Sequence, residues 1–368
     1  MKSFPQPGAI TLLVVILITC TLLFLFQKVI WLVVPFLLAL MLFYCLRPAV
    51  EALVVRGMRH ETAAKTVWIL LQSIMATIVL AVGLLFVAKA GTWQTDFNRY
   101  VAGGENLLKG TAGMLENNIP VFKSMDLSGQ VDQVIQQFTN RFAGRNLLPV
   151  SLQSLKWLPS LLLVPYFIYF MLNDSARLKK YIIKSVPNAF FEKGLLLCSR
   201  LDATLQNYFQ GLFLLTLLDT ACLAIGLEAL GVANAIWLGL ASAILAWIPT
   251  LGSLIGCVLV VLVAATDFPD RAWIAYACLL LFLSVRMLDD FLFMPLTIGR
   301  KLRVHPLLSV LMLCLGAAVA GTTGLVLALP LFGVVAVIGE TVSQVVTDRK
   351  LKARYRATRQ LVPLQTAV

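Results

Sequence analysis

The sequence predicts an all-α, polytopic membrane protein, and three observations support this fold class. Of the 368 residues, 60% are hydrophobic and only 13% are charged, and the mean hydropathy is +0.88. Soluble domains have about 25% charged residues, so this chain lacks the polar side chains that cover a water-exposed surface. Several apolar runs also approach or exceed the ~18 to 20 residues that cross about 30 Å of hydrocarbon as a helix. The composition therefore excludes a soluble enzyme.

The N-terminal region, residues 1–89, contains the first three predicted membrane spans. Residues 9–26 and 29–46 are apolar and are separated by only two polar residues, which predicts an antiparallel pair of helices. A third apolar run covers residues 67–88 and follows a polar stretch. The first run has no small-residue cleavage pattern after it, so we expect it to be a retained span and not a signal peptide.

The middle of the chain alternates between polar and apolar segments. Residues 90–150 are rich in Asp, Asn, Gln and Gly, with apolar residues at helical spacing, which predicts a small helical extracytoplasmic insertion. Residues 151–173 return to apolar composition and form the predicted fourth span. Residues 174–205 are basic and amphipathic, so we expect them to lie on the cytoplasmic surface of the membrane.

Residues 206–345 form the predicted C-terminal membrane core, in which two apolar stretches have unusual lengths. As helices, residues 234–264 and 306–342 would reach roughly 46 and 55 Å at about 1.5 Å per residue, too long for one upright crossing and scarcely enough for two. Both have Gly and Pro near the middle. They are predicted to be re-entrant helical hairpins, whose unpaired backbone groups need burial in protein or a water-filled path. Alternatively, Gly and Pro in these stretches only permit a kink or close helix packing.

The distribution of basic residues supports a topology with about five transmembrane helices and two opposed re-entrant hairpins. If both hairpins return to the side from which they enter, the cytoplasmic side holds 20 basic and 6 acidic residues. The outside then holds 9 basic and 8 acidic residues. This asymmetry agrees with the positive-inside rule and predicts cytoplasmic N- and C-termini, with residues 346–368 as a basic cytoplasmic tail.

Asp219 is the sharpest single candidate for a functional residue. It lies in the middle of an apolar run, where an ionised carboxylate costs roughly 2.5 to 3.5 kcal/mol on insertion scales. One interpretation is a site that exchanges a proton or a cation during transport. The other is a structural carboxyl group that joins two helices, for instance through Thr216 or Thr220 of its own helix.

A second candidate cluster consists of Arg286, Asp289 and Asp290. Their i, i+3 and i+4 spacing lets one helical turn pair the arginine with either carboxylate. Because one negative charge remains, the cluster could take part in the passage of a cation or a proton, or in gating it. Alternatively, these residues approach the cytoplasmic interface and stabilise the end of the span.

No motif predicts an enzyme, a cofactor or a metal site. His60 and Glu61 begin like a zinc-protease motif, but the second histidine is missing, so zinc could not be held. The seven cysteines lie almost entirely in apolar runs without CxxC spacing, and there is no nucleotide-binding P-loop. The net charge of +12 is explained by the excess of basic residues in the predicted cytoplasmic segments, so we do not expect nucleic-acid binding.

The C-terminal third carries motifs that resemble a known family. They are Ala246-Trp-Ile-Pro-Thr-Leu-Gly252, Pro295-Leu-Thr-Ile-Gly-Arg300, His305-Pro-Leu-Leu308 and Gly321-Thr-Thr-Gly-Leu-Val-Leu-Ala-Leu-Pro330. Together with the order of spans and the polar insertion after the third span, they resemble the autoinducer-2 exporter (AI-2E) family of bacterial membrane proteins. The resemblance covers nearly the whole chain, although the centre of the Gly321 motif is more polar than is usual in the family.

The resemblance implies a permease-like, multi-pass protein of the bacterial inner membrane that contacts membrane lipid and assembles as a homo-oligomer, with a pentamer expected. Members of the family are linked to export of a quorum-sensing signal or to sodium/proton antiport, so the family name does not define a substrate. Asp219 belongs to none of the motifs. The matching positions imply these pathway residues: Pro249, Gly252, Pro295, Gly299, Pro306, Gly321, Gly324 and Pro330.

The sequence therefore predicts a transporter or exporter of a small polar solute or ion. An ion gradient is the expected driving force, because no nucleotide-binding loop is present. Two alternatives stay open: a non-transporting membrane scaffold or envelope-organising protein, and a passive, channel-like facilitator.

Overall fold

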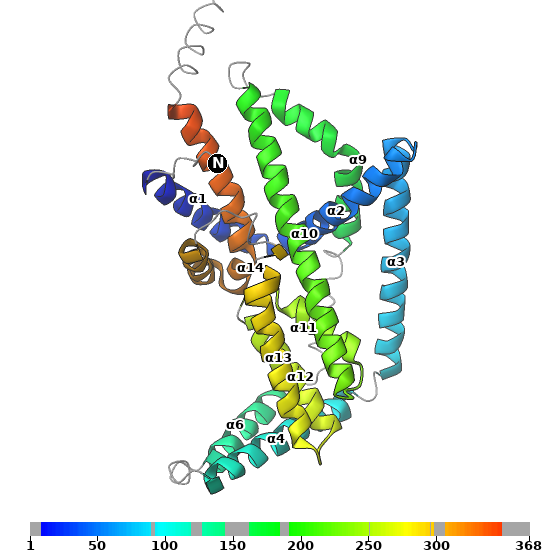
Figure 1. The fold of residues 1–368 in the computed structure, drawn as a ribbon, viewed down its shortest axis with the longest axis vertical. Helices are drawn as coiled ribbons and strands as arrows, with labels where there is room; N and C mark the ends of the chain where they lie inside the picture. Colours follow the sequence, from blue (N-terminus) through cyan, green and yellow to red (C-terminus); the bar gives the residue numbers. More distant parts are fainter. Residues whose placement is uncertain are drawn as a thin grey trace, which may run out of the picture. The chain divides into compact units, whose positions relative to one another are not determined.

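The structure is a computed structural model that describes residues 9–89, 93–118, 127–143, 162–184, 191–249, 251–294, 296–297 and 306–347. These residues are almost entirely helical and contain no β-strand, so the all-α fold class is confirmed (Figure 1). The elements are α1 (Ala9–Lys28), α2 (Ile30–Val55), α3 (His60–Lys89), α4 (Trp93–Asn118), α6 (Leu127–Ala143), α9 (Leu163–Lys184), α10 (Phe191–Ala229), α11 (Ala235–Leu245), α12 (Leu251–Asp267), α13 (Ala272–Leu288), the π-helical turn η3 (Asp289–Phe293) and α14 (Pro306–Thr347).

Five helices in these described ranges are long and apolar enough to cross a membrane, which confirms a polytopic membrane protein. Large apolar side chains on their surfaces are exposed, as at Leu70, Leu80 and Val87 of α3, which are 61%, 65% and 74% exposed. In water such a surface would be unfavourable, whereas lipid solvates it. The candidate spans are Trp31–Val55, His60–Ala81, Phe191–Ala229, Ala272–Phe293 and Leu307–Ser343.

The chain divides into two compact units, which are described separately. Unit 1 contains residues 1–70, 160–213 and 297–368, and unit 2 contains residues 71–159 and 214–296. Both α3 and α10 contribute residues to the two units.

In unit 1, α1 packs along α14 and α2 packs against α9. The prediction that the first two helices form an antiparallel pair is wrong. The amide of Val29 donates to Phe26 O, and Leu32 N and Val33 N donate to Val29 O, so helical hydrogen bonding continues across the junction without reversing the chain. The apolar faces of α1 and α14 meet in two clusters, built around Val15, Met312, Phe332 and Val335 and around Leu23, Ala320 and Leu327.

Helix α14 is interrupted near its middle and is not a straight rod. Ala320 and Gly321 leave the helical conformation, and Gly321 has φ 58° and ψ −138°, a combination that glycine adopts with little strain. Gly316 before the break and Gly324 after it lie close together: a Cβ atom on Gly316 would lie 2.7 Å from the carbonyl oxygen of Gly324. Residues eight apart in a straight helix are about 12 Å apart along its axis. The chain therefore folds back at Gly321.

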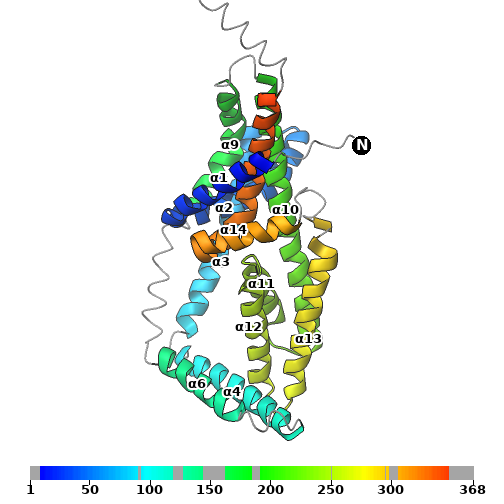
Figure 2. The same ribbon diagram turned by 90° about the vertical axis from the view of Figure 1, so that its left-hand side faces the viewer.

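In unit 2, α11 and α12 form a helical hairpin that packs beside α13 (Figure 2). The two helices are joined by residues 246–250, so the stretch 234–264 is also broken where the sequence predicted. Gly239 brings α11 against α10: a Cβ atom there would lie 3.1 Å from the carbonyl oxygen of Thr220. The surrounding apolar core includes Leu227, Val260, Ala264 and Cys278, all fully buried.

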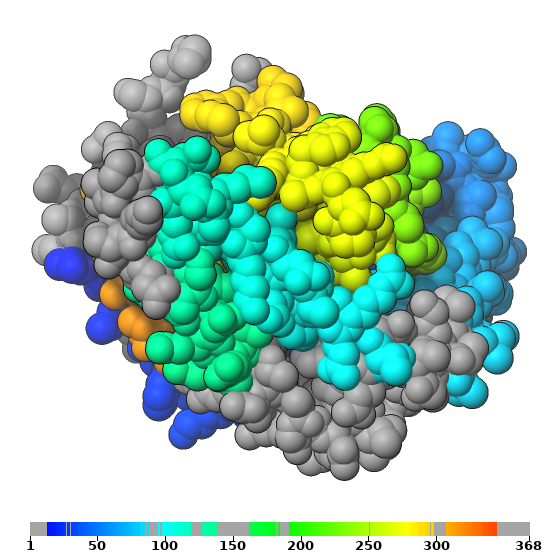
Figure 3. Space-filling model, turned by 90° about the horizontal axis from the view of Figure 1, so that it is seen from below, coloured from blue at the N-terminus to red at the C-terminus, as the bar shows by residue number. Residues whose placement is uncertain are grey.

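The described residues of the polar stretch 90–150 form α4 and α6, which pack on each other and lie across the ends of α12 and α13 (Figures 1 and 2). Seen from this end, the side chains of α4 lie directly beside those of the α12–α13 connection (Figure 3). Gly103 of α4 touches Thr266 of α12, and Arg99 forms an ion pair of 3.0 Å with Asp267. The polar helices are thus fastened to the apolar core of unit 2.

One predicted segment is divided differently in the structure, and two others lie partly outside the described residues. The basic segment 174–205 is divided between the end of α9 and the start of α10, and α10 continues unbroken through residue 206 to Ala229. The first part of the fourth predicted span, residues 151–161, and most of the basic tail, residues 348–368, lie outside the described residues.

Candidate functional site

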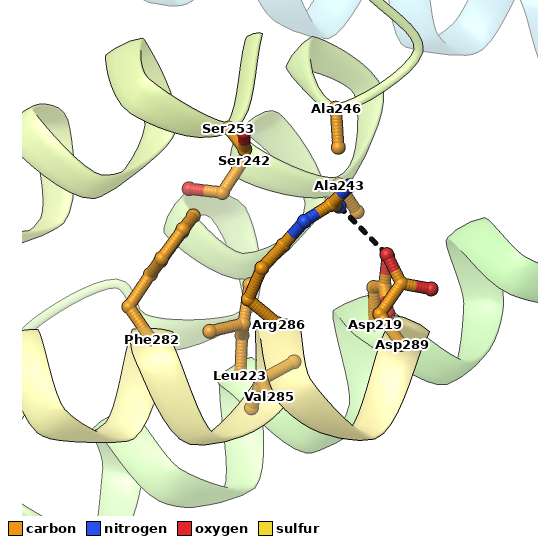
Figure 4. Close-up of a pocket in the computed structure, with 10 residues that line it drawn as sticks. All are labelled: Asp219, Leu223, Ser242, Ala243, Ala246, Ser253, Phe282, Val285, Arg286 and Asp289. Atoms are coloured by element: carbon orange, nitrogen blue, oxygen red, sulfur yellow. Dashed lines mark hydrogen bonds and ion pairs between the residues drawn. The ribbon is translucent and has the colours of Figure 1, made fainter. Parts of the chain in front are cut away.

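A small cavity in unit 2 brings the charged residues of the C-terminal core together (Figure 4). It leaves about 20 Å³ for the centres of water-sized molecules, which is enough for one water or one bare cation. An organic solute does not fit this cavity without a change in the surrounding helices. Its lining comes from α10, the α11–α12 hairpin, α13 and η3: Asp219, Leu223, Ser242, Ala243, Ala246, Ser253, Phe282, Val285, Arg286 and Asp289.

Asp219 faces this cavity from α10 and is only 6% exposed. Its Oδ1 atom has no hydrogen-bond partner among the described residues. Thr220, which the sequence offered as a partner, donates instead to the carbonyl oxygen of Thr216 at 2.7 Å. The geometry therefore gives no support to an aspartate that is tied to the hydroxyl of Thr220.

Arg286 and Asp289 form a close ion pair at the edge of the cavity. The Nη1 atom of Arg286 donates to Oδ2 of Asp289 at 2.7 Å, while its Nη2 atom lies 3.7 Å from Oδ1 of Asp290. The side chain of Asp289 is 6% exposed and that of Asp290 is 57% exposed. The same guanidinium thus reaches one buried and one exposed carboxylate.

Asp219 on α10 and Asp289 on η3 both line the cavity (Figure 4). Like Asp219, Asp289 has a buried Oδ1 atom without a hydrogen-bond partner in the described part of the chain. Two buried carboxylates with a single arginine leave one uncompensated negative charge if both are ionised. A proton or a cation at this point would neutralise it.

The wall of the cavity opposite α13 is the tip of the α11–α12 hairpin. Trp247, in the connecting turn, donates its Nε1–H to the hydroxyl of Thr216 on α10 at 2.8 Å. Gly252 lies directly against the carbonyl group of Leu245, so the turn has no room for a side chain there. These contacts hold the tip close to α10.

The structure brings together residues that the sequence identified separately. Asp219 and the pair Arg286 and Asp289, far apart in sequence, line the same cavity, whereas Asp290 lies outside the lining, 3.7 Å from Arg286. Pro249 and Gly252 lie in the turn and at the start of α12 that form one wall. Pro306 begins α14, while Gly321, Gly324 and Pro330 lie in α14, in unit 1. Pro295 and Gly299 lie outside the described residues.

Sequence reasoning did not identify Ser242 and Ser253 as site residues, and it included Trp247 only as part of the Ala246–Gly252 motif. Ser242 is 1% exposed, and its Oγ atom has no hydrogen-bond partner within the described ranges. A small polar residue in an apolar helix is a weak signal, because its hydroxyl usually bonds the backbone of its own helix. The described residues contain no group of three or more His, Cys, Asp or Glu side chains that could hold a metal ion.

An all-α, multi-pass fold with a charged cavity buried among apolar helices is typical of proteins that move solutes across membranes. A family model described as AI-2E family transporter matches residues 11–344. The chain therefore belongs to the AI-2E family of membrane transporters, as its motifs indicated.

Named relatives agree with this assignment. A protein named as a transport protein in Mycobacterium tuberculosis is 29% identical over 325 residues, 86% of this chain and 85% of that one. The Escherichia coli K12 protein PerM, named as a permease, is 24% identical over 359 residues, covering 90% and 92%. YueF of Bacillus subtilis, named as a transport protein, is 35% identical over 173 residues, but the match spans only 46% of its length and 47% of this chain.

Proposed function

We propose that this protein is a secondary transporter that moves a small polar solute or an ion, driven by an ion gradient. The observation that carries the proposal is the buried pair Asp219 and Asp289 with the single cation Arg286 at a cavity of one-ion size. Such an arrangement exchanges a proton or a cation readily, because either one relieves the uncompensated buried charge. The exchange would couple the ion gradient to movement of the hairpin tip.

The proposal includes a membrane arrangement. The α11–α12 hairpin and the folded α14 would be re-entrant segments that enter from opposite sides of the bacterial inner membrane. Support comes from the breaks near Pro249 and at Gly321, since irregular backbone at membrane depth is tolerated only in protein or beside water. Both termini would be cytoplasmic, as the charge distribution favours.

A homo-oligomer, with a pentamer as the expected size, belongs to the same proposal. The exposed apolar faces of α3 and α10 would be shared between lipid and neighbouring copies. Mass measurement of the purified protein in lipid nanodiscs tests this directly, and a monomer would contradict it. Export of a quorum-sensing signal and sodium/proton antiport are the two transport activities to test first.

Flux in proteoliposomes tests the function. We expect wild-type protein to transport under an imposed pH or sodium gradient, and Asp219→Asn to reduce that flux by about tenfold or more, because an amide can neither release a proton nor neutralise a cation. Asp270→Asn, which changes an exposed acid in the connection between α12 and α13, is the matched control and should keep the wild-type flux.

The alternative outcomes are distinct. Flux that is independent of any gradient and unchanged in Asp219→Asn would indicate a passive facilitator. Absence of flux for every solute and ion in the panel, with a folded protein, would favour a membrane scaffold. Either result would refute ion-coupled transport through this site.

A further inference from the structure

We propose that Arg286 is a tethered counter-ion of the Asp219–Asp289 pair, which moves from Asp289 to Asp290 when a monovalent metal cation enters the cavity. This inference rests on the proposed function and adds the step by which the site fills and empties. It assigns different roles to two carboxylates that are adjacent in sequence.

The distances and exposures make Asp289 and Asp290 unequal partners of one guanidinium. Nη1 is in full hydrogen-bond contact with the buried Asp289 at 2.7 Å, whereas Nη2 is 3.7 Å from the exposed Asp290, close enough for an ion pair but too far for a hydrogen bond. The two forked nitrogens of arginine can serve two acceptors at once. A small rotation of the side chain would therefore exchange a strong bond to Asp289 for a strong bond to Asp290.

The backbone at this point supports such an exchange. The π-helical turn η3 begins at Asp289, directly after α13 ends at Leu288. π-Helical turns are rare and occur frequently at functional sites. The turn places one carboxylate toward the cavity and leaves its neighbour exposed, so Arg286 has a second partner outside the cavity.

The carboxylate oxygens that face the cavity once Arg286 has moved to Asp290 are suited to bind a cation. Asp219 Oδ1 and Asp289 Oδ1 are buried and have no hydrogen-bond partner among the described residues, and both side chains belong to the cavity lining. The two aspartates are 6% and 4% exposed, so their charges are poorly screened by water. Hard cations such as Na⁺ prefer oxygen ligands. The cavity has room for one ion of this size, and the guanidinium, which lines it, neutralises Asp289 while the ion is absent.

A purely structural ion pair makes a different prediction. If Arg286 only stabilised the end of α13, then removing either the arginine or an aspartate would weaken the protein and its ligand binding together. A tethered counter-ion competes with the entering cation instead. Neutralising Arg286 should then tighten cation binding, and neutralising Asp290 should weaken it.

The experiment measures binding of Na⁺, Li⁺ and K⁺ to purified full-length protein in nanodiscs. The shift of the thermal unfolding midpoint is followed as each chloride salt replaces choline chloride at constant ionic strength, which yields an apparent Kd. We expect at least one of these cations to stabilise the wild type. Arg286→Gln should bind it about tenfold more tightly, and Asp290→Asn about tenfold more weakly, since removing a nearby positive or negative charge raises or lowers the affinity for a cation.

A matched control separates local from general charge effects. Arg99→Gln removes the arginine of the 3.0 Å pair with Asp267, on the polar helix α4, and should leave the apparent Kd unchanged within about twofold. Should Arg286→Gln fail to fold, Arg286→Lys keeps the charge but loses the fork, and it should bind the cation more tightly than wild type because lysine holds Asp289 and Asp290 less well.

Each result decides the inference. Equal or weaker cation binding in Arg286→Gln, or in Arg286→Lys where the glutamine variant is unfolded, would overturn it. So would a wild type that none of the three cations stabilises, including the case of a site that exchanges protons only. The proposed function fails separately, when gradient-driven flux is insensitive to Asp219→Asn.

Discussion

The break in α14 makes a graded prediction about two glycines that lie three residues apart. Gly321 has a positive φ of 58° but open space around it, with no atom within 4 Å of a built Cβ. Gly324 is helical, and a Cβ atom there would collide with the backbone carbonyl group of Gly316. Alanine at position 321 therefore tests backbone strain alone, and alanine at position 324 tests a steric clash alone.

The expected magnitudes differ accordingly. Gly321→Ala places an L-residue in a region where each such residue costs about 1–3 kcal/mol, and nothing else needs to move. Gly324→Ala adds a methyl group against backbone that cannot rotate away, so the two limbs of α14 must separate. Overpacking of this kind costs about 1–3 kcal/mol, and the lost contacts between the limbs add to that cost. We expect Gly324→Ala to be the more destabilising substitution.

The assay is unfolding of the purified protein in mild detergent by heat or by added SDS, followed by circular dichroism. Gly110→Ala is the control, because Gly110 lies in α4, is exposed and has open space around its Cβ position. Helix propensity predicts that this control is more stable than wild type by about 0.5–1 kcal/mol. Wild-type stability in Gly324→Ala, or a larger loss in Gly321→Ala, would show that the limbs do not pack at Gly316 and Gly324.

Two further predictions concern the polar helices and the topology. Hydrogen bonds from the backbone amide and hydroxyl of Ser128 hold the pKa of Glu116 below its usual range, so the α4–α6 contact should be complete above the ordinary glutamate pKa and weaken as the pH falls through the lowered value. Hydrogen exchange of α6 at decreasing pH measures this, Glu116→Gln should remove the pH dependence, and protection that stays constant in acid would contradict the assignment. Single cysteines at Glu105 and at Lys301, in a cysteine-free background, test the topology with a membrane-impermeant thiol reagent. Position 105 should react from outside and position 301 only after permeabilisation, and external labelling of position 301 would rule out the proposed arrangement.

Much of the fold could be predicted because helices that contact lipid are encoded by long apolar runs. Apolar runs of sufficient length identify the membrane helices, and the Gly and Pro residues near Pro249 and at Gly321 mark the places where two long stretches break. The partners of the helices could not be predicted in this way. Helix α1 is apolar on all sides, so its sequence carries no periodicity to indicate that it packs on α14 and not on α2.

The charged residues of the site could be predicted from the sequence, but the packing that brings them together could not. Asp219 and the Arg286 cluster are conspicuous because charged side chains are rare in apolar helices. Their meeting in one cavity depends on how closely α10, α13 and the hairpin approach, which Gly239 permits through its contact with Thr220. Trp247 lies in one of the family motifs, but its hydrogen bond could not be predicted, since the acceptor is a hydroxyl group on another helix.

The packing of α1 on α14 has a consequence for biosynthesis. Val15 and Met312 belong to one cluster, although almost the whole chain separates them, so the ribosome completes α1 long before it makes α14. Until then α1 must be stabilised by lipid or by the insertion machinery. Premature termination before α14 would therefore leave the earliest helix without its partner, and quality-control proteases would encounter the defect at the opposite end of the polypeptide from the missing segment.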